Sequence, residues 1–295
     1  MKINILLPYK EKFDENKASS VSITVKNNLL HTKFLSDIRV YGQNVENPLF
    51  KDDYARYFLN DEMVKKSHEM SSILPDTKEL VRYRIKYFND KITEHIDAGA
   101  TQIVLLGGGF DMRACKYAKP NVQFFDVDQA TVLNFKQNVI EKNNINYPSI
   151  FIPCNYIEED VISLMKKGGF KTEESTLFIW EGNSMYIPEK LIFDLFNTLT
   201  KNISRFSIAF DYLTYDILNQ DSGKEELDEV AEIFDDLGSP WITGFDNIHI
   251  IEENTSLIVS EDVPMTILEK SYEPEKPSTE AELINTYSVC TFETE

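Results

Sequence analysis

Two kinds of hydrophobic spacing divide the chain near residue 100. Before this point, hydrophobic residues recur at intervals of three and four over Lys78–Asp97, with Lys and Arg between them, and Gly99 follows. This pattern predicts an amphipathic helix that ends at a C-terminal glycine. Stretches around Asn27–Arg39 and Asp52–Lys65 predict two further helices. We therefore expect residues 1–98 to form a helical N-terminal cover.

After Gly99 the chain alternates short aliphatic and aromatic runs with longer helical stretches. Strands are predicted at 102–106, 122–128, 149–154, 176–180 and 206–211. Helices are predicted at 130–142, 157–167 and 188–202. Such alternation is typical of a parallel sheet with helices on both faces. The remaining expected elements are an acidic helix at 224–237, a strand at 257–263, an exposed loop at 273–278, and a last strand at 289–293 beside its predecessor.

The most informative pair of motifs is a glycine turn and the acid that ends the next strand. Gly107, Gly108 and Gly109 follow the first predicted strand directly, and Asp128 lies 21 residues after Gly107. Glycines let a ligand approach the backbone, and an acid about 20 residues further on accepts hydrogen bonds from ribose hydroxyls. Asp126 points to the same face of its strand and is the alternative. These motifs predict a ligand that contains a ribose.

Two classes of ligand use this arrangement. A dinucleotide site needs a third glycine, where helix and strand pack around a pyrophosphate, and Met112 occupies that position here. S-adenosylmethionine has no pyrophosphate, so its site needs only the turn and the acid. The sequence therefore favours S-adenosylmethionine over a dinucleotide.

Charge sharpens this preference. The 295 residues include 30 Lys and Arg against 49 Asp and Glu, which gives a formal net charge of −19 and a pI near 4.7. This excess argues against nucleic acid and anionic membranes as partners. Much of it lies in runs that are typical of solvated faces. An acidic cleft with Asp126, Asp128 and Glu181 would favour a cationic sulfonium over an anionic dinucleotide.

Neither metal chemistry nor export is expected. The three cysteines are widely spaced and fit neither a disulfide framework nor a zinc site, and Cys154 is expected to be a small buried residue. The four histidines are scattered. The N-terminal apolar stretch is too short for a signal sequence, and no run approaches the ~18 apolar residues of a spanning helix. We expect a cytoplasmic protein without a metal.

Several blocks in order carry a family resemblance. They are VRYRIKYFND, GATQIVLLGGGFDMRACKY, VQFFDVDQATVLNFK, FIWEGNSMYIPE and IAFDY. Over Asn47–Asp262 the chain resembles the leucine carboxyl methyltransferase family, including bacterial relatives regarded as S-adenosylmethionine-dependent O-methyltransferases. The most specific motif is EG followed by MY and Pro, here from Glu181 to Pro188. The resemblance implies a seven-strand Rossmann-like sheet over 99–295, with a substrate-side elaboration around 212–256.

The resemblance also implies roles for individual residues on the cofactor side. Arg82, in preference to Arg84, would pair with the methionine carboxylate, and a guanidinium can hold a carboxylate with two hydrogen bonds. The glycine turn would contact the methionine portion through its backbone, and Asp128 would hold the ribose. Asn155, where the family usually has aspartate, and Tyr156 would contact the adenine.

The remaining roles concern the end of the fourth strand and the residues directly after the glycine turn. Glu181 would attract the sulfonium or the methionine amine. Tyr186 is either a substrate contact or a core aromatic residue. Asp111 and Arg113 are expected to form a local ion pair that holds the glycine turn.

The function expected from this resemblance is O-methyl transfer by in-line displacement to a carboxylate or hydroxyl of a small molecule or peptide terminus. No histidine falls within the matched blocks near the strand ends, which favours an acidic acceptor that needs no general base. The alternatives are a non-catalytic S-adenosylmethionine-binding protein, an NAD-dependent oxidoreductase, and a purely structural α/β protein.

Overall fold

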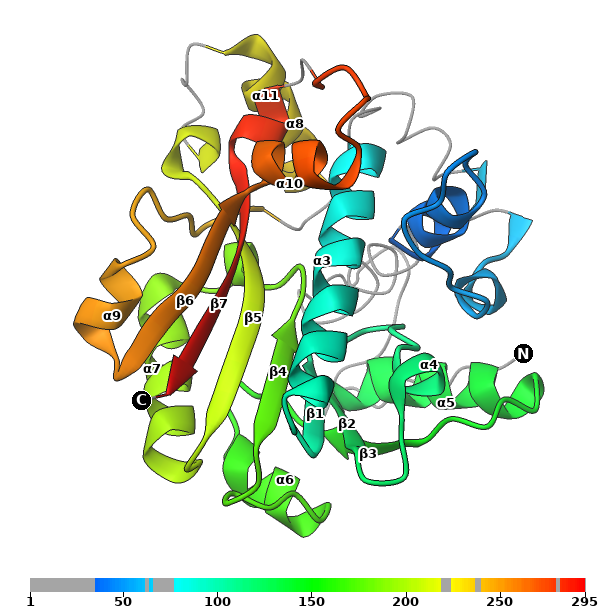
Figure 1. Cartoon of the computed structure of the whole chain (residues 1–295), viewed down its shortest axis with the longest axis vertical. Coiled ribbons are helices and arrows are strands. Elements are labelled where there is room, and N and C mark those ends of the chain that lie inside the picture. The colour runs from blue at the N-terminus through cyan, green and yellow to red at the C-terminus, as the bar shows by residue number, and fades with distance from the viewer. Residues whose placement is uncertain are drawn as a thin grey trace, which may run out of the picture.

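A seven-stranded sheet forms the centre of the structure, a computed structural model that describes residues 35–61, 64–65, 77–218, 224–236, 240–279 and 282–294 (Figure 1). The strand order is β3-β2-β1-β4-β5-β7-β6. Strands β1 to β5 run parallel, whereas β7 is antiparallel to both β5 and β6. The predicted fold class, a Rossmann-like sheet of seven strands, is confirmed.

The strands lie where hydrophobic runs predict them, with small differences at their ends. Their bounds are β1 Gln102–Leu106, β2 Gln123–Asp128, β3 Ser149–Pro153, β4 Thr176–Trp180, β5 Phe206–Leu213, β6 Leu257–Pro264 and β7 Tyr287–Thr294. Strands β1 and β4 are buried along their whole length because they lie in the middle of the sheet, covered on both faces.

Helices cover both faces of this sheet. The longer helices are α3 Thr77–Asp97, α5 Ala130–Lys142, α6 Val161–Lys167, α7 Glu189–Asn202, α8 Glu225–Asp236 and α10 Met265–Tyr272. The short helical elements are α4 Ala114–Tyr117, α9 Ile250–Asn254 and α11 Glu282–Asn285, with 3-10 turns η1 Ala55–Phe58, η2 Ser184–Tyr186 and η3 Tyr215–Leu218. Figure 1 shows α3, in cyan, running along one face of the sheet.

Alternating side chains of the strands build two hydrophobic layers. Ile103 and Leu105 of β1 join the cluster under α3, α8, α10 and α11. Val104 and Leu106 join the opposite cluster, which α6, α7 and α9 cover. A third, smaller cluster encloses Phe110 and Met112 between η1 and α5 beside the glycine turn.

Some helix predictions differ from the structure. The helix expected from residue 157 begins at Val161, because Asp160 caps it by accepting a hydrogen bond from the Ser163 amide at 3.0 Å. The helix expected at 52–65 is replaced over Ala55–Phe58 by a 3-10 turn. Residues 35–43 are helical, whereas the rest of the helix expected at 27–39 falls outside the described residues. The helix α10 was not predicted.

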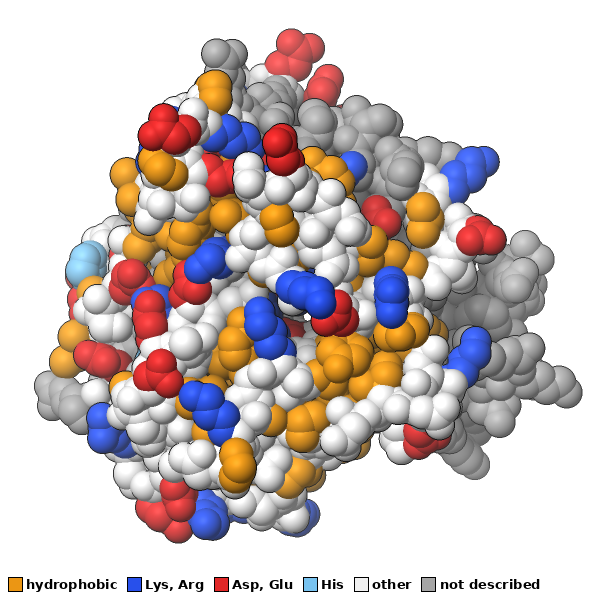
Figure 2. All heavy atoms as spheres, turned by 45° about the vertical axis from the view of Figure 1, so that its right-hand side comes forward, with side chains coloured by type: hydrophobic (Ala, Val, Ile, Leu, Met, Phe, Trp, Pro, Cys, Tyr) orange, Lys and Arg blue, Asp and Glu red, His pale blue; other side chains and the backbone are white. Residues whose placement is uncertain are grey.

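The face shown in Figure 2 carries acidic and basic side chains together, with hydrophobic side chains between them. The acidic excess of the chain therefore does not form a patch of one sign on this face. Within the ranges that the structure describes, no helix has both the length and the apolar character needed to cross a membrane.

Candidate functional site

A cavity of about 410 Å³ lies at the carboxyl ends of β1, β2 and β4. The strand order reverses between β1 and β4, and crevices at such switch points are where open α/β sheets bind ligands. Its lining includes eight of the nine predicted site residues and one further residue, Arg39, from the N-terminal segment. The eight are Gly107, Gly108, Gly109, Asp128, Asn155, Tyr156, Glu181 and Tyr186.

The glycine turn forms the floor of this cavity. Gly107 has a positive φ of 63°, and a Cβ there would lie 2.6 Å from the Asn183 Oδ1 and 2.8 Å from the Tyr156 hydroxyl. Only glycine fits such a close approach and such a backbone angle. Gly109 also has a positive φ, of 54°. The turn thus exposes backbone to the cavity, as the sequence predicts.

Asp128 borders the cavity, whereas Asp126 does not. The Asp128 carboxylate accepts hydrogen bonds from the amides of Gly109, at 2.8 Å, and Gln129, at 2.6 Å. These contacts fix the acid against the glycine turn. Burial raises the pKa of Asp128 to about 6, although both amide hydrogen bonds lower it.

Asp126 belongs to a buried polar cluster behind the glycine turn. Its Oδ2 lies 3.1 Å from the ammonium of Lys136, which is fully buried, and 2.5 Å from the hydroxyl of Tyr147. The Lys136 ammonium also donates to the Asp111 carbonyl. Of the two candidate acids, the geometry therefore leaves Asp128 to face a ligand, and Asp126 ties β2 to the loop after the glycine turn.

The wall beyond β3 is formed by Asn155 and Tyr156. The Asn155 amide group donates to Glu158 at 2.9 Å, and its Oδ1 accepts from the Ile157 amide at 3.3 Å. The Tyr156 hydroxyl accepts from the indole of Trp180 at 3.1 Å and donates to Asn183 at 3.2 Å. These bonds hold the Tyr156 ring in the cavity wall.

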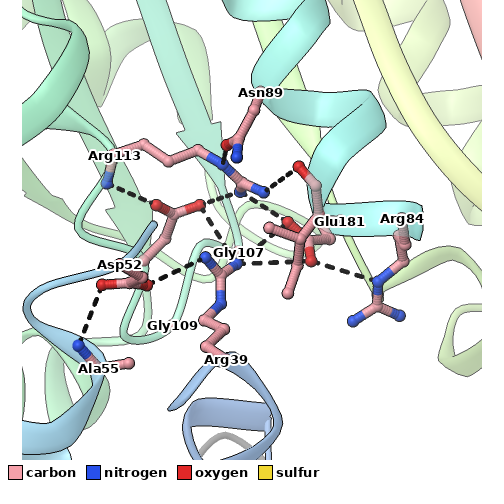
Figure 3. Close-up of polar contacts among 12 residues, drawn as sticks. Arg39, Asp52, Ala55, Arg84, Asn89, Gly107, Gly109, Arg113 and Glu181 are labelled. Carbon is pink, nitrogen blue, oxygen red and sulfur yellow. Dashed lines mark hydrogen bonds and ion pairs between the residues drawn. The ribbon is translucent and has the colours of Figure 1, made fainter. Parts of the chain in front are cut away.

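Glu181, at the end of β4, lies among three arginines (Figure 3). Its carboxylate is 3.2 Å from Arg39 Nη2, 3.2 Å from Arg84 Nε and 2.6 Å from Arg113 Nη1. Burial alone would raise the pKa of Glu181, but the charges of Arg113, Arg39 and Arg84 lower it to about 2. Glu181 is therefore a fixed anion at neutral pH.

The arginines are held in turn by further acids. Arg113 pairs with Asp111, which confirms the predicted local ion pair, and its Nε donates to Asn89 at 2.7 Å. Arg39 comes from helical residues 35–43 and also reaches Asp52, at 3.5 Å. Figure 3 shows Arg39 between Asp52 and Glu181.

Neither Arg82 nor Arg84 lines the cavity, but Arg84 lies directly behind the lining residue Gly182, so the geometry favours Arg84 over the predicted Arg82. The Arg82 guanidinium pairs with Glu79 and, at 3.2 Å, with Glu273 in the loop after α10. The two arginines are two positions apart on α3, so their side chains leave the helix in nearly opposite directions. Arg84 is the one that contacts Glu181.

One nitrogen of Arg84 is left without a partner. Nε donates to Glu181, and Nη1 donates to Asp211 at 3.2 Å and to Tyr287 at 2.8 Å. Nη2 is buried and finds no hydrogen-bond partner among the residues that the structure describes. A Cβ on the cavity-lining Gly182 would lie 3.5 Å from Nη1 and Nη2. An anionic group of a ligand would satisfy this donor.

The far wall of the cavity consists of Tyr186 and several apolar side chains. Tyr186 lines it, and the indole of Trp241 donates to the Tyr186 hydroxyl at 3.2 Å, which ties this wall to the segment after α8. The apolar residues on this wall are Leu35, Ile187, Pro240 and Ile242.

Sequence reasoning missed four residues of this site. Asn183 lies inside the EG motif, just after the strand predicted at 176–180, and this position at a strand end is a signal that could have identified it. Its side-chain amide donates to the Gly107 carbonyl at 3.3 Å. Asp211, in the IAFDY block, is the last residue of the strand predicted at 206–211 and offered the same signal. Arg39 and Tyr287 lie far from every motif, and no local pattern points to them.

The sheet order, the cavity at its switch point and the acid beside a glycine turn define a Rossmann-like methyltransferase fold. Residues 35–200, more than half of the chain, match the model described as leucine carboxyl methyltransferase, and the chain belongs to this family.

Known proteins show the same relationship. A Frankia alni protein provisionally named an S-adenosyl-L-methionine-dependent methyltransferase is 29% identical over 133 residues, 44% of this chain and 47% of that protein. A Streptomyces coelicolor protein with the same provisional name is 30% identical over 168 residues, 52% and 58% of the two chains. The chain spans about half the length of the curated relatives it matches.

Solved structures agree in fold. A structure provisionally described as a methyltransferase from Thermobifida fusca has a TM-score of 0.61 and 11% identity, covering 90% of this chain and 94% of that one. A DUF574 family protein from Streptomyces avermitilis has a TM-score of 0.60 and 11% identity, covering 90% and 97%. At this identity the likeness concerns the fold alone.

Proposed function

We propose that this protein is an S-adenosylmethionine-dependent O-methyltransferase that methylates a carboxylate or hydroxyl of a small molecule or a peptide terminus. The observation that carries the proposal is a pair of anchors, one that lines the cavity and one directly behind its wall. Asp128 offers acceptors at the end of β2, and Arg84 offers an unpartnered donor behind Gly182 at the end of β4. A ribose hydroxyl suits the first, and the carboxylate of a methionine group suits the second.

The remaining lining fits the same ligand. Asn155 and Tyr156 lie beyond β3, where an adenine ring would pack against Tyr156. The glycine turn lets the chain between ribose and carboxylate cross the tips of β1 and β4 without meeting a Cβ. Glu181, anionic at neutral pH, lines the cavity beside this path, and its carboxylate is paired with Arg39, Arg84 and Arg113.

When bound, S-adenosylmethionine supplies a methyl group on a sulfonium, which is already activated for in-line displacement. The residues of the chain therefore contribute orientation and exclusion of water. Asp128 and Arg84 would fix the ribose and the methionine carboxylate of the ligand. The wall of Leu35, Ile187 and Ile242 would keep water from the reacting atoms.

The acceptor is best matched by an oxygen that needs no general base. Among the described residues that line the cavity there is neither histidine nor lysine. Burial raises the pKa of Tyr186 well above its usual range, so its hydroxyl stays protonated. A carboxylate is ionised at neutral pH and reacts without losing a proton, whereas an alcohol benefits from a base. We therefore favour a carboxylate, and Arg39 is the one cationic side chain among the described residues that line the cavity.

Two measurements test this function, ligand binding first and methyl transfer second. Calorimetry with S-adenosylmethionine, S-adenosylhomocysteine and NAD should give binding of the two adenosyl ligands in preference to NAD. Transfer of a labelled methyl group should then be measured over panels of carboxylic acids, phenols and aliphatic alcohols.

Each outcome has a clear meaning. Methylation of carboxylic acids supports the proposal as stated. Preferential binding of NAD would overturn it in favour of an oxidoreductase. Tight adenosyl binding with no methylated product over the whole panel would favour a non-catalytic binding protein instead.

A further inference from the structure

Arg84 is held by three residues, and Nη2 of its guanidinium is buried without a hydrogen-bond partner among the described residues. Glu181 takes only Nε, at 3.2 Å, whereas Asp211 and Tyr287 both take Nη1. Asp211 is fully buried and Tyr287 nearly so. The two are also hydrogen-bonded to each other through the tyrosine hydroxyl and Asp211 Oδ2.

Asp211 has a second contact that concerns the cavity itself. Its other oxygen, Oδ1, accepts the amide of Gly182 at 2.6 Å. Gly182 has a positive φ of 70° and lines the cavity directly in front of the guanidinium. One carboxylate thus holds both the arginine and the backbone turn that separates the arginine from the cavity.

The chemistry of the guanidinium shows why these contacts matter. A free arginine beside a carboxylate prefers a bidentate pair, in which two nitrogens of one edge face both oxygens. Arg84 would reach that pair with Glu181 by turning Nη2 toward it. Asp211 and Tyr287 oppose this turn because they hold Nη1, and the second oxygen of Glu181 is already paired with Arg39 and Arg113. Nη2 therefore stays buried and unpaired next to Gly182.

We propose that Asp211 and Tyr287 are positioning residues, which keep Nη2 of Arg84 directed at the carboxylate of the methionine group of the cofactor. This inference rests on the proposed function. It adds that recognition of the amino-acid end of the ligand depends on β5 and β7, neither of which carries a residue of the glycine turn or the ribose site.

The test uses two ligands that differ only at that end. S-adenosylhomocysteine carries the amino-acid group, and 5′-methylthioadenosine has a methyl group in its place. Calorimetry on Asp211→Asn and Tyr287→Phe should show about 10-fold weaker binding of S-adenosylhomocysteine, the scale of one hydrogen bond to a charged group. Binding of 5′-methylthioadenosine should change by less than about 2-fold.

Tyr212→Phe is the matched control. Tyr212 is the next residue on β5, is equally buried and donates to Asp262 at 2.8 Å, but it does not line the cavity. Its variant should bind both ligands as the wild type does. Thermal unfolding of each variant identifies those that fold, and Tyr287→Phe decides the question if Asp211→Asn does not fold.

A double-mutant comparison tests the route of the effect. If Asp211 acts through Arg84, then Asp211→Asn should weaken S-adenosylhomocysteine no further in an Arg84→Met background. Equal losses for both ligands, or wild-type affinity in folded Tyr287→Phe, would overturn the positioning role while leaving the proposed function intact. A wild-type chain that binds neither ligand would overturn both.

Discussion

Nη2 of Arg39 lies 3.2 Å from Oε2 of Glu181, across 142 residues of sequence. The same guanidinium reaches Asp52 through Nη1 at 3.5 Å. One side chain therefore connects helical residues 35–43, the segment before η1 and the end of β4. This contact makes the N-terminal segment part of the cavity rather than a separate layer over it.

Arg39→Met should loosen residues 35–43 without unfolding the sheet. Glu181 retains Arg84 and Arg113, so we expect a loss of about 1–3 kcal/mol in the free energy of unfolding. Hydrogen exchange should accelerate in residues 35–43 and stay unchanged in β1. Arg56→Met, at an exposed arginine whose guanidinium donates to the Tyr57 hydroxyl outside the cavity, is the control. Unchanged exchange in residues 35–43 would contradict the assignment.

Asp128→Ala should remove the ribose contact. We expect the affinity for S-adenosylhomocysteine to fall by about 1.5–3 kcal/mol, the range for hydrogen bonds to a charged group. The measurement is calorimetry at pH 7.5, with circular dichroism to show that the variant folds. Wild-type affinity in a folded variant would exclude Asp128 from the ligand site.

Asp126→Asn should instead destabilise the fold. It leaves the fully buried ammonium of Lys136 without its anion, and a buried charge that loses its partner costs about 3–5 kcal/mol. Urea denaturation measures the loss. Asp194→Asn breaks an exposed pair with Lys190 and should cost less than about 1 kcal/mol. Equal effects of the two substitutions would show that the Lys136 pair contributes little.

Ligand affinity should depend on pH through Asp128. Its pKa is raised to about 6 in the free protein, and a ribose hydroxyl donates best to the ionised acid. Affinity for S-adenosylhomocysteine should therefore be constant above pH 7 and fall, by up to about tenfold per pH unit, as the pH drops below 6. In Asp128→Asn this dependence should disappear. A wild-type affinity that is flat from pH 5 to 8 would argue against the contact.

Ile242→Lys should impair use of the acceptor more than binding of the cofactor. Ile242 lines the far wall of the cavity and is 48% exposed. A lysine there replaces apolar surface with a charge and should raise the acceptor KM about 10-fold or more, with unchanged affinity for S-adenosylhomocysteine. Ile267→Lys, at a residue on α10 that is 58% exposed and outside the cavity lining, should leave both unchanged.

Much of the sheet could be predicted because its signals are local. The central strands are continuous hydrophobic runs, and the run at 176–180 matches β4 residue for residue. The predicted position of the last strand beside its predecessor is confirmed by the pairing of β7 with β6. The pairing of β7 with β5 could not be predicted, since it joins segments far apart in the sequence. The short helix α10 begins at Met265, directly after β6 ends at Pro264, so no loop residues mark its start in the sequence.

The same distinction applies to the candidate site: residues with a local signal could be predicted, whereas residues placed by packing could not. The glycine turn and Asp128 follow from strand ends that adjoin in the sheet. Arg82 and Arg84 share one helix, and only the packing of α3 shows which of them faces β4. Arg39 lies on helical residues 35–43, and the position of this helix relative to the sheet cannot be predicted from residue spacing.

The sheet order also determines when the pocket is completed during synthesis. β7 pairs with β5 on one side and with β6 on the other, and β6 is the edge of the sheet. On a ribosome adding about 5–20 residues per second, β1 to β5 emerge well before β7. Until then the edge of β5 stays unpaired, and Arg84 and Asp211 lack Tyr287. We therefore expect a nascent chain that ends before β7 to retain the ribose side of the site and to lack the finished amino-acid side.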